Sequence, residues 1–177
     1  DAAAQLPPRS NLTEFVEMGA SLVTFSGGKG LSGPQSSGLV VGKKEYVDAV
    51  RLNSSPYSAV GRSMKVGKEE ILGLVAAIDV FLDRSDDDDR TRWLKQATVV
   101  VDALSHLPDV KAYVMTEGQE AAPDFAPRAY VDLADVQKRE VMKALREGDP
   151  SIVVRSQTKG ILIEPMTMQG GEEESVA

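Results

Sequence analysis

The residue type and setting best suited to chemistry in this sequence is a lysine on a glycine-rich loop. Lys29 stands in the segment Ser26-Gly27-Gly28-Lys29-Gly30, directly after the apolar run 20–25. A lysine held at a sheet edge and partly removed from water has a lowered pKa, so that its free amine becomes a nucleophile. Glycines let a ligand approach the backbone closely. The residue types therefore fit either a Schiff-base lysine or a lysine that contacts phosphate.

An ordinary solvated loop lysine is the alternative for any isolated Lys-Gly pair, because short motifs match by chance. A phosphate-binding P-loop is excluded. Lys29 is followed by Gly30 instead of Ser or Thr, and the required glycine spacing is absent.

Hydrophobic periodicity predicts the elements that must position this loop. A helix, strand, loop, strand and helix follow one another in the first part of the chain, which favours an α/β layer. Asn11 is predicted to be the N-cap of the first helix, and a small α+β domain follows the two long central helices. The predicted helices cover 11–18, 43–52, 68–82, 86–104 and 134–147, the predicted strands cover 20–25, 38–42, 110–115, 129–133, 151–155 and 160–164, and a proline-rich loop covers 122–127.

Composition limits the functions that this chain can have. Lys and Arg number 20 against 27 Asp and Glu, so the net charge of −7 gives no general attraction to nucleic acid or anionic lipid. Without cysteine there is no disulfide, thiolate nucleophile or Cys-ligated zinc. No apolar run approaches the ~20 residues that span a membrane, and the segment 1–11 is no signal peptide. A soluble, cytoplasmic protein is expected.

Three other features are predicted to carry no chemistry. His106 is the only histidine, which argues against a His-rich metal site or a Ser-His-Asp triad. The acidic run 86–89 lacks the spacing of a calcium loop and fits the first turn of a helix. The run 172–174 is interpreted as a solvated tail. No metal site is expected.

A longer pattern adds a family resemblance. The segment 21–45, SLVTFSGGKGLSGPQSSGLVVGKKE, resembles the lysine region of the fold-type I pyridoxal-phosphate enzymes. It is most similar to the branch that contains bacterial selenocysteine synthase (L-seryl-tRNA selenium transferase) and the D-glucosaminate-6-phosphate ammonia lyases. The resemblance extends through 62–71, RSMKVGKEEI, and more loosely to the C-terminal strands. It implies the end of a cofactor-binding α/β large domain (1–67), connecting helices (68–107) and a small α+β domain (108–177).

The resemblance also implies a role for particular residues. Lys29 would bind pyridoxal 5'-phosphate and move protons at the substrate α-carbon. Ser26 matches a position whose hydroxyl contacts the cofactor phosphate, although a turn serine is the alternative. Asp1 would face the protonated pyridine nitrogen, with Ala3 beneath the ring, whereas without the resemblance Asp1 is an ordinary exposed acid.

Basic residues would hold the substrate. Arg62 and Lys65 look like the residues that bind an anionic group in the selenocysteine-synthase branch, and a pair of solvated cations is the alternative. Arg155 is a weaker candidate for binding a substrate carboxylate, and an ordinary surface arginine on a strand is the favoured interpretation. The N-terminal half that fold-type I enzymes also need does not precede Asp1, so the chain is interpreted as a C-terminal half.

These observations lead to one functional hypothesis and its alternatives. The hypothesis is a pyridoxal-phosphate-dependent lyase or transferase that acts at the α and β carbons of a small amino-acid-like substrate. Ammonia elimination from an amino-sugar acid phosphate is preferred, because the net charge of −7 disfavours a tRNA-sized partner. An aminotransferase, a racemase and a non-catalytic assembly domain are the alternatives. The whole protein is expected to form a homodimer or larger homo-oligomer.

Overall fold

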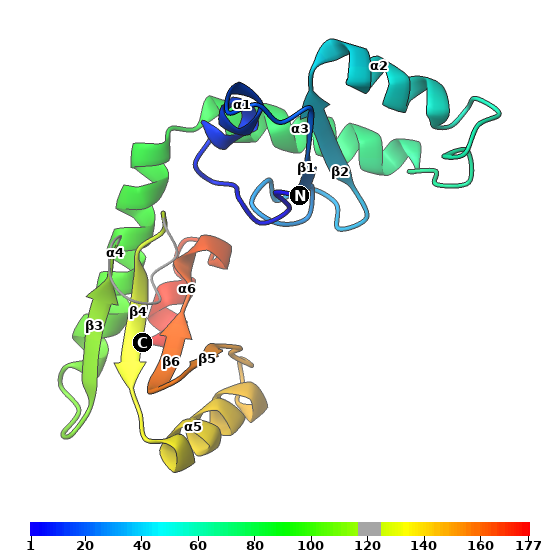
Figure 1. Cartoon of the computed structure of the whole chain (residues 1–177). Coiled ribbons are helices and arrows are strands. Elements are labelled where there is room, and N and C mark those ends of the chain that lie inside the picture. Colours follow the sequence, from blue (N-terminus) through cyan, green and yellow to red (C-terminus); the bar gives the residue numbers. More distant parts are fainter. Residues whose placement is uncertain (117–124) are drawn as a thin grey trace. The chain divides into compact units, whose positions relative to one another are not determined.

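The computed structural model describes residues 1–116 and 125–177. The chain divides into two compact units, Asp1–Asp86 and Asp87–Ala177 (Figure 1). Each unit has its own apolar core. No helix in these two ranges is long and apolar enough to cross a membrane.

The first unit combines a two-stranded antiparallel sheet with three helices. β1 and β2 pair so that Leu22 lies opposite Gly42 and Ser26 opposite Gly38. The predicted helices and strands of this unit are confirmed to within two residues. Its elements are α1 (Asn11–Glu17), β1 (Leu22–Ser26), β2 (Gly38–Gly42), α2 (Lys44–Asn53) and α3 (Lys68–Asp83).

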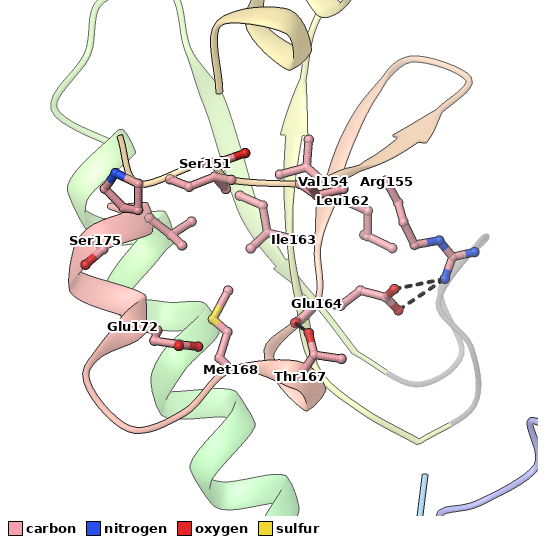
Figure 2. Close-up of a pocket in the computed structure, with 14 residues that line it drawn as sticks. Ser151, Val154, Arg155, Leu162, Ile163, Glu164, Thr167, Met168, Glu172 and Ser175 are labelled. Carbon is pink, nitrogen blue, oxygen red and sulfur yellow. Dashed lines mark hydrogen bonds and ion pairs between the residues drawn. The ribbon is translucent and has the colours of Figure 1, made fainter. Parts of the chain in front are cut away.

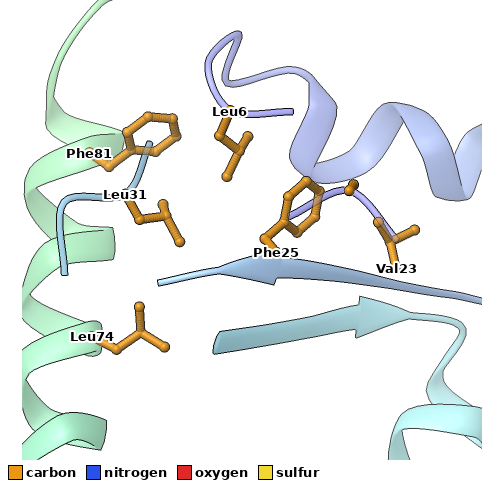
Figure 3. Packing of buried hydrophobic residues seen from close by; sticks show 7 residues of the cluster. Leu6, Val23, Phe25, Leu31, Leu74 and Phe81 are labelled. Atoms are coloured by element: carbon orange, nitrogen blue, oxygen red, sulfur yellow. The ribbon is translucent and has the colours of Figure 1, made fainter. Parts of the chain in front are cut away.

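The core of the first unit lies on one face of β1. Val23 and Phe25 are buried while Leu22 and Thr24 between them are exposed, so β1 alternates as a half-buried strand does. Although 20–25 and 38–42 are mostly apolar, the described residues cover only one face of the strand pair. Burial of each large side chain contributes about 1.5–3 kcal/mol. Figure 3 shows the cluster, which includes Leu6, Val23, Phe25, Leu31, Leu74 and Phe81.

The start of α1 differs from the prediction. Ser10, not Asn11, is the N-cap residue, and its side chain makes no capping hydrogen bond. The Asn11 side chain instead donates a 2.6 Å hydrogen bond to the Gln5 carbonyl. Asn11 thus fixes the chain before the helix, a role that local sequence spacing does not reveal.

Arg9 joins the N-terminal segment to the end of α3. Its Nε donates to the Phe81 carbonyl at 2.6 Å, its guanidinium pairs with the Asp86 carboxylate, and the same guanidinium lies 4.5 Å from the centre of the Phe81 ring. The Asp86 carboxylate also accepts the Arg9 backbone N–H at 3.1 Å. The Arg9 side chain is 13% exposed, so this pair is less screened by water than a surface pair.

Replacing Arg9 by alanine should lower the free energy of unfolding by about 2 kcal/mol, because the Asp86 carboxylate and the Phe81 carbonyl lose partners in a partly buried setting. Urea unfolding followed by circular dichroism measures the change. Lys44→Ala is the matched control, since its pair with Asp48 is largely exposed and should contribute less than about 0.5 kcal/mol. Equal effects of the two substitutions would contradict this interpretation.

The second unit is an antiparallel four-stranded sheet with the order β3-β4-β6-β5. Side chains of α4 and α5 pack against alternate residues of β4 and β6. This core includes Val100 of α4, Val131 of β4 and Ile161 of β6. The other residues of these strands place Tyr130 beside Tyr113, where desolvation, then Tyr113 and Asp132, raise the pKa of Tyr130. The elements are α4 (Asp86–Leu104), β3 (Lys111–Met115), β4 (Arg128–Asp132), α5 (Asp135–Glu147), β5 (Arg155–Gln157), β6 (Gly160–Ile163), the 3-10 helix η1 (Pro165–Thr167) and α6 (Glu172–Val176).

Two predictions for the second unit need correction, and a third falls partly outside the described residues. The strand predicted over 151–155 begins only at Arg155, because the pairing with β6 stops at Leu162. The acidic run 172–174 forms the start of α6 and is not a free tail, since Glu173 accepts a hydrogen bond from Gln96 of α4 at 3.1 Å. Residues 122–124 of the expected proline-rich loop lie outside the described ranges.

Glu173 makes the docking of α6 depend on pH. Its own backbone N–H, and next the Gln96 amide, donate hydrogen bonds that lower the pKa of Glu173 below its ordinary value of 4.5. A lowered pKa in the folded state means that the contact stabilises above pH 4.5 and is lost as the pH falls through the folded value. The amides of residues 172–176 should therefore lose protection as the pH falls, measured by hydrogen exchange and corrected for the intrinsic pH dependence of exchange. Glu173→Gln still accepts both hydrogen bonds and does not titrate, so in this variant the loss of protection in acid should disappear. The same loss of protection in Glu173→Gln as in the wild type would refute the assignment.

The second unit also has an aliphatic cavity of about 180 Å³ that is partly open to solvent. It lies between the end of α4, the sheet and α5, and Val176 of α6 contributes to its wall. Among the described residues its lining consists only of Leu, Val and Ile side chains, so it offers no polar partner that would hold a water molecule.

Candidate active site

Lys29 lies in a turn at the end of β1. The turn covers residues 27–31, and two buried side chains anchor it: Phe25 before the turn and Leu31 at its end, which are 3% and 2% exposed. The Lys29 carbonyl accepts the Ser32 N–H at 2.8 Å. The Lys29 side chain is exposed, so within this chain it does not have the partial desolvation that the sequence suggested.

The glycines of this turn are packed too closely for other residues. A Cβ on Gly27 would overlap the Ser37 hydroxyl, and one on Gly30 would overlap the Leu6 carbonyl. Gly27 also donates to the Ser37 carbonyl at 2.9 Å and accepts from Gly33 N–H at 2.7 Å. The glycines thus keep the lysine turn folded against its own return segment and against the N-terminal segment.

The N-terminal residues lie beside the strand that leads to Lys29. The N-terminus lies beside β1 in Figure 1. Ala2 is buried, and its N–H donates to the Thr24 carbonyl of β1 at 2.9 Å. The exposed Asp1 carboxylate accepts the Ala3 N–H at 2.9 Å, and Ser26 is half-buried at the end of β1. Four of the predicted site residues therefore sit on neighbouring segments, namely Asp1, Ala3, Ser26 and Lys29.

Arg62 and Lys65 are placed differently. Both are exposed in the loop between α2 and α3, and the Arg62 guanidinium donates to the Pro56 carbonyl. Within the described ranges neither side chain contacts Lys29. The structure of the single chain does not assemble these two residues with the lysine turn.

Arg155 is part of an ion-pair network in the second unit. It donates to both Glu164 oxygens, at 3.1 and 3.2 Å, and Glu164 also lies 2.8 Å from Nε of the buried Arg128. Arg155 is 57% exposed whereas Arg128 is 7% exposed. Sequence reasoning missed Arg128 and Glu164, because their meeting depends on the pairing of β4 with β6.

The cavity in Figure 2 lies beside this network in the second unit. It measures about 440 Å³, and every residue of its lining belongs to the second unit. Apolar side chains such as Val154, Ile163 and Met168 form much of its wall, with Ser151 and Ser175 among the hydroxyl groups. The lysine turn remains the candidate chemical site because of the sequence pattern around Lys29. In the described ranges no group of three or more His, Cys, Asp or Glu side chains is placed to bind a metal.

Comparison with known proteins agrees with the sequence resemblance. The family model described as L-seryl-tRNA selenium transferase matches residues 3–116. The L-seryl-tRNA(Sec) selenium transferase of Solidesulfovibrio magneticus is 28% identical and aligns with 99% of this chain and 41% of its own length. A 5'-C-glycyluridine monooxygenase-decarboxylase of Streptomyces sp is 29% identical (99% and 43%), and the D-glucosaminate-6-phosphate ammonia lyase of Salmonella typhimurium is 27% identical (97% and 44%). The chain thus spans about two fifths of the length of these relatives.

Solved structures support the fold. The crystal structure of a SepCysS–SepCysE N-terminal domain complex matches 98% of this chain and 46% of its own chain, with a TM-score of 0.55 and 19% identity. The apo cysteine desulfurase of Thermococcus onnurineus NA1 matches 88% and 45%, with a TM-score of 0.50 and 20% identity. The expected α/β architecture of the fold-type I pyridoxal-phosphate enzymes is confirmed. Since the family model covers more than half of its residues, this chain belongs to the L-seryl-tRNA selenium transferase family.

Proposed function

We propose that this chain carries the lysine-bearing part of the active site of a pyridoxal-phosphate-dependent lyase or transferase. One observation carries the proposal: the Lys29 amine has no hydrogen bond or ion pair within the described residues and projects from a turn whose backbone is fixed by close glycine packing. A lysine held in this way has a fixed backbone position and an amino group that is not engaged by another residue, and covalent attachment of a cofactor requires both.

The neighbouring residues fit the cofactor. Pyridoxal phosphate needs an amine for its aldehyde, an acid beside its ring nitrogen and donors for its phosphate, and when bound it supplies an electron sink for the substrate α-carbon. Lys29, Asp1 and Ser26 are groups of these three kinds. They lie at the end of β1 and on the segment that Ala2 fixes to this strand.

Each residue then has a separate task. Lys29 holds the cofactor and moves a proton to and from the substrate α-carbon. The Asp1 carboxylate holds a proton on the pyridine nitrogen, and the small Ala3 side chain leaves room for the ring. Arg62 and Lys65 bind an anionic group of the substrate, and because the single chain does not bring them to Lys29, a second copy in a homo-oligomer is the proposed source of this pair. Groups other than the described residues must exclude water from the exposed Lys29.

The proposed reaction is removal of the α-proton and loss of the β-substituent of an amino-acid-like substrate. In the preferred version the substrate is an amino-sugar acid phosphate: its β-hydroxyl leaves as water, and water then hydrolyses the released enamine to a keto acid and ammonia. The relative named D-glucosaminate-6-phosphate ammonia lyase supports this choice, and the net charge of −7 disfavours a nucleic-acid partner. The relatives named selenium transferase and monooxygenase-decarboxylase have comparable identity, so identity by itself does not select the substrate.

Reductive labelling tests the cofactor. The chain is incubated with pyridoxal phosphate, treated with borohydride and digested for peptide mass mapping. The same procedure is applied to the chain fused to the part of the Solidesulfovibrio relative that it does not match. Labelling concentrated on Lys29 in the fusion supports the proposal. Labelling spread over exposed lysines in both proteins would overturn it.

A further inference from the structure

The lysine turn is held from one side by the side chain of Gln35. Its Nε2 donates a hydrogen bond to the Gly28 carbonyl at 3.0 Å. The contact is close along the whole side chain, because a Cβ on Gly28 would lie 2.6 Å from both Cα and Oε1 of Gln35. The amide therefore lies directly against the residue that precedes Lys29.

The bonded carbonyl belongs to the same peptide plane as the Lys29 nitrogen. Because a peptide unit is rigid, fixing the Gly28 carbonyl also fixes the plane from which the Lys29 Cα and side chain project. Gly28 offers no side chain that would hold this plane by itself, and glycine has more backbone freedom than any other residue. A hydrogen bond from another residue, here Gln35, therefore has a large effect on the orientation of the Gly28–Lys29 peptide.

Gln35 is itself connected to a larger element. It follows Pro34, and Pro34 packs against α3 so closely that a Cβ on Gly73 would lie 2.8 Å from the proline Cγ. A continuous series of contacts therefore runs from α3 through Pro34 and Gln35 to the peptide that carries Lys29.

We propose that Gln35 is a positioning residue for Lys29: its amide orients the Gly28–Lys29 peptide and so directs the lysine amine toward the cofactor aldehyde. The part about the cofactor rests on the proposed function, whereas the part about the turn does not. Gln35 touches neither cofactor nor substrate in this role and acts only through the backbone of Gly28.

Two substitutions test the role. Gln35→Ala removes the side chain, and Gln35→Glu keeps its shape but replaces the donating amide by a carboxylate, which only accepts. Ser36→Ala is the matched control, because Ser36 is exposed in the same loop and has no side-chain partner among the described residues. Hydrogen exchange of the Ser32 and Gly33 amides, which bond within the turn, reports on the turn. Reductive labelling of Lys29 relative to Lys43, measured in the fusion described above, reports on the amine.

In both Gln35 variants the Ser32 and Gly33 amides should exchange about 3- to 10-fold faster at neutral pH, as the loss of one hydrogen bond predicts. The ratio of Lys29 labelling to Lys43 labelling should fall by a similar factor. In acid, near the ordinary Glu pKa of about 4.3, the Gln35→Glu carboxyl regains a proton to donate. Its protection should then return toward wild type while that of Gln35→Ala does not.

Each remaining outcome decides a different point. Wild-type exchange in both variants would overturn the proposal, as would faster exchange with unchanged Lys29 preference, because the role would then be structural only. If the wild-type protein shows no Lys29 preference, the proposed function fails, and the exchange data still decide whether Gln35 holds the turn.

Discussion

Replacing Lys29 by alanine is expected to abolish specific labelling by pyridoxal phosphate, because no other amine occupies the turn at the end of β1. In an active full-length protein the same change should lower kcat by at least about 10³-fold, since the covalent contact with the cofactor and the proton carrier are lost together. Peptide mapping after borohydride treatment measures the first effect, and steady-state kinetics measures the second.

Lys29→Arg and Lys43→Ala are the informative controls. Arginine keeps the positive charge but stays protonated and does not form the bond, so Lys29→Arg should behave as Lys29→Ala does. Lys43 precedes α2, outside the lysine turn, so its replacement should leave the labelling of Lys29 unchanged. Residual specific labelling in Lys29→Ala would place the reactive amine at another position.

Gly30→Ala is expected to cause a large loss of stability in the first unit. The added Cβ would fall on the Leu6 carbonyl, a backbone group that moves only with its whole segment. Overpacking of this kind costs about 1–3 kcal/mol, and the upper end applies because the obstacle is backbone. Urea unfolding monitored by circular dichroism should show a decrease in unfolding free energy of about 3 kcal/mol.

Gly170→Ala provides the comparison for this change. A Cβ on Gly170 would meet no heavy atom within 4 Å, so the substitution should be neutral or slightly stabilising. A large effect at Gly170, or none at Gly30, would show that the glycine packing around the lysine turn does not determine stability.

The sequence predicts best those features that depend on local periodicity or on a long motif. α3 and α4 are long and carry apolar residues at helical spacing, so their existence follows from the sequence and their bounds are confirmed closely. Lys29 stands out because glycines, a preceding apolar strand and a Gly-Pro-Gln segment occur together. The resemblance built on these residues led to the correct family.

Features that depend on distant partners were not predictable in the same way. α6 is only five residues long and is held by Gln96, which lies 77 residues earlier in the chain than Glu173. The segment 151–154 is apolar enough for a strand, yet it stays outside the ladder because pairing is set by β6. The contacts of Ala2 with β1 and of Arg128 with Glu164 likewise require knowledge of which strands lie together.

The aliphatic cavity of the second unit has a consequence for compression. A space of about 180 Å³ whose lining side chains are all aliphatic holds water poorly, so this part of the core is packed less densely than a filled core. Unfolding removes this loosely packed volume, and the resulting decrease in volume means that hydrostatic pressure favours the unfolded state. High pressure should therefore act on the packing of α4, α5 and α6 on their sheet.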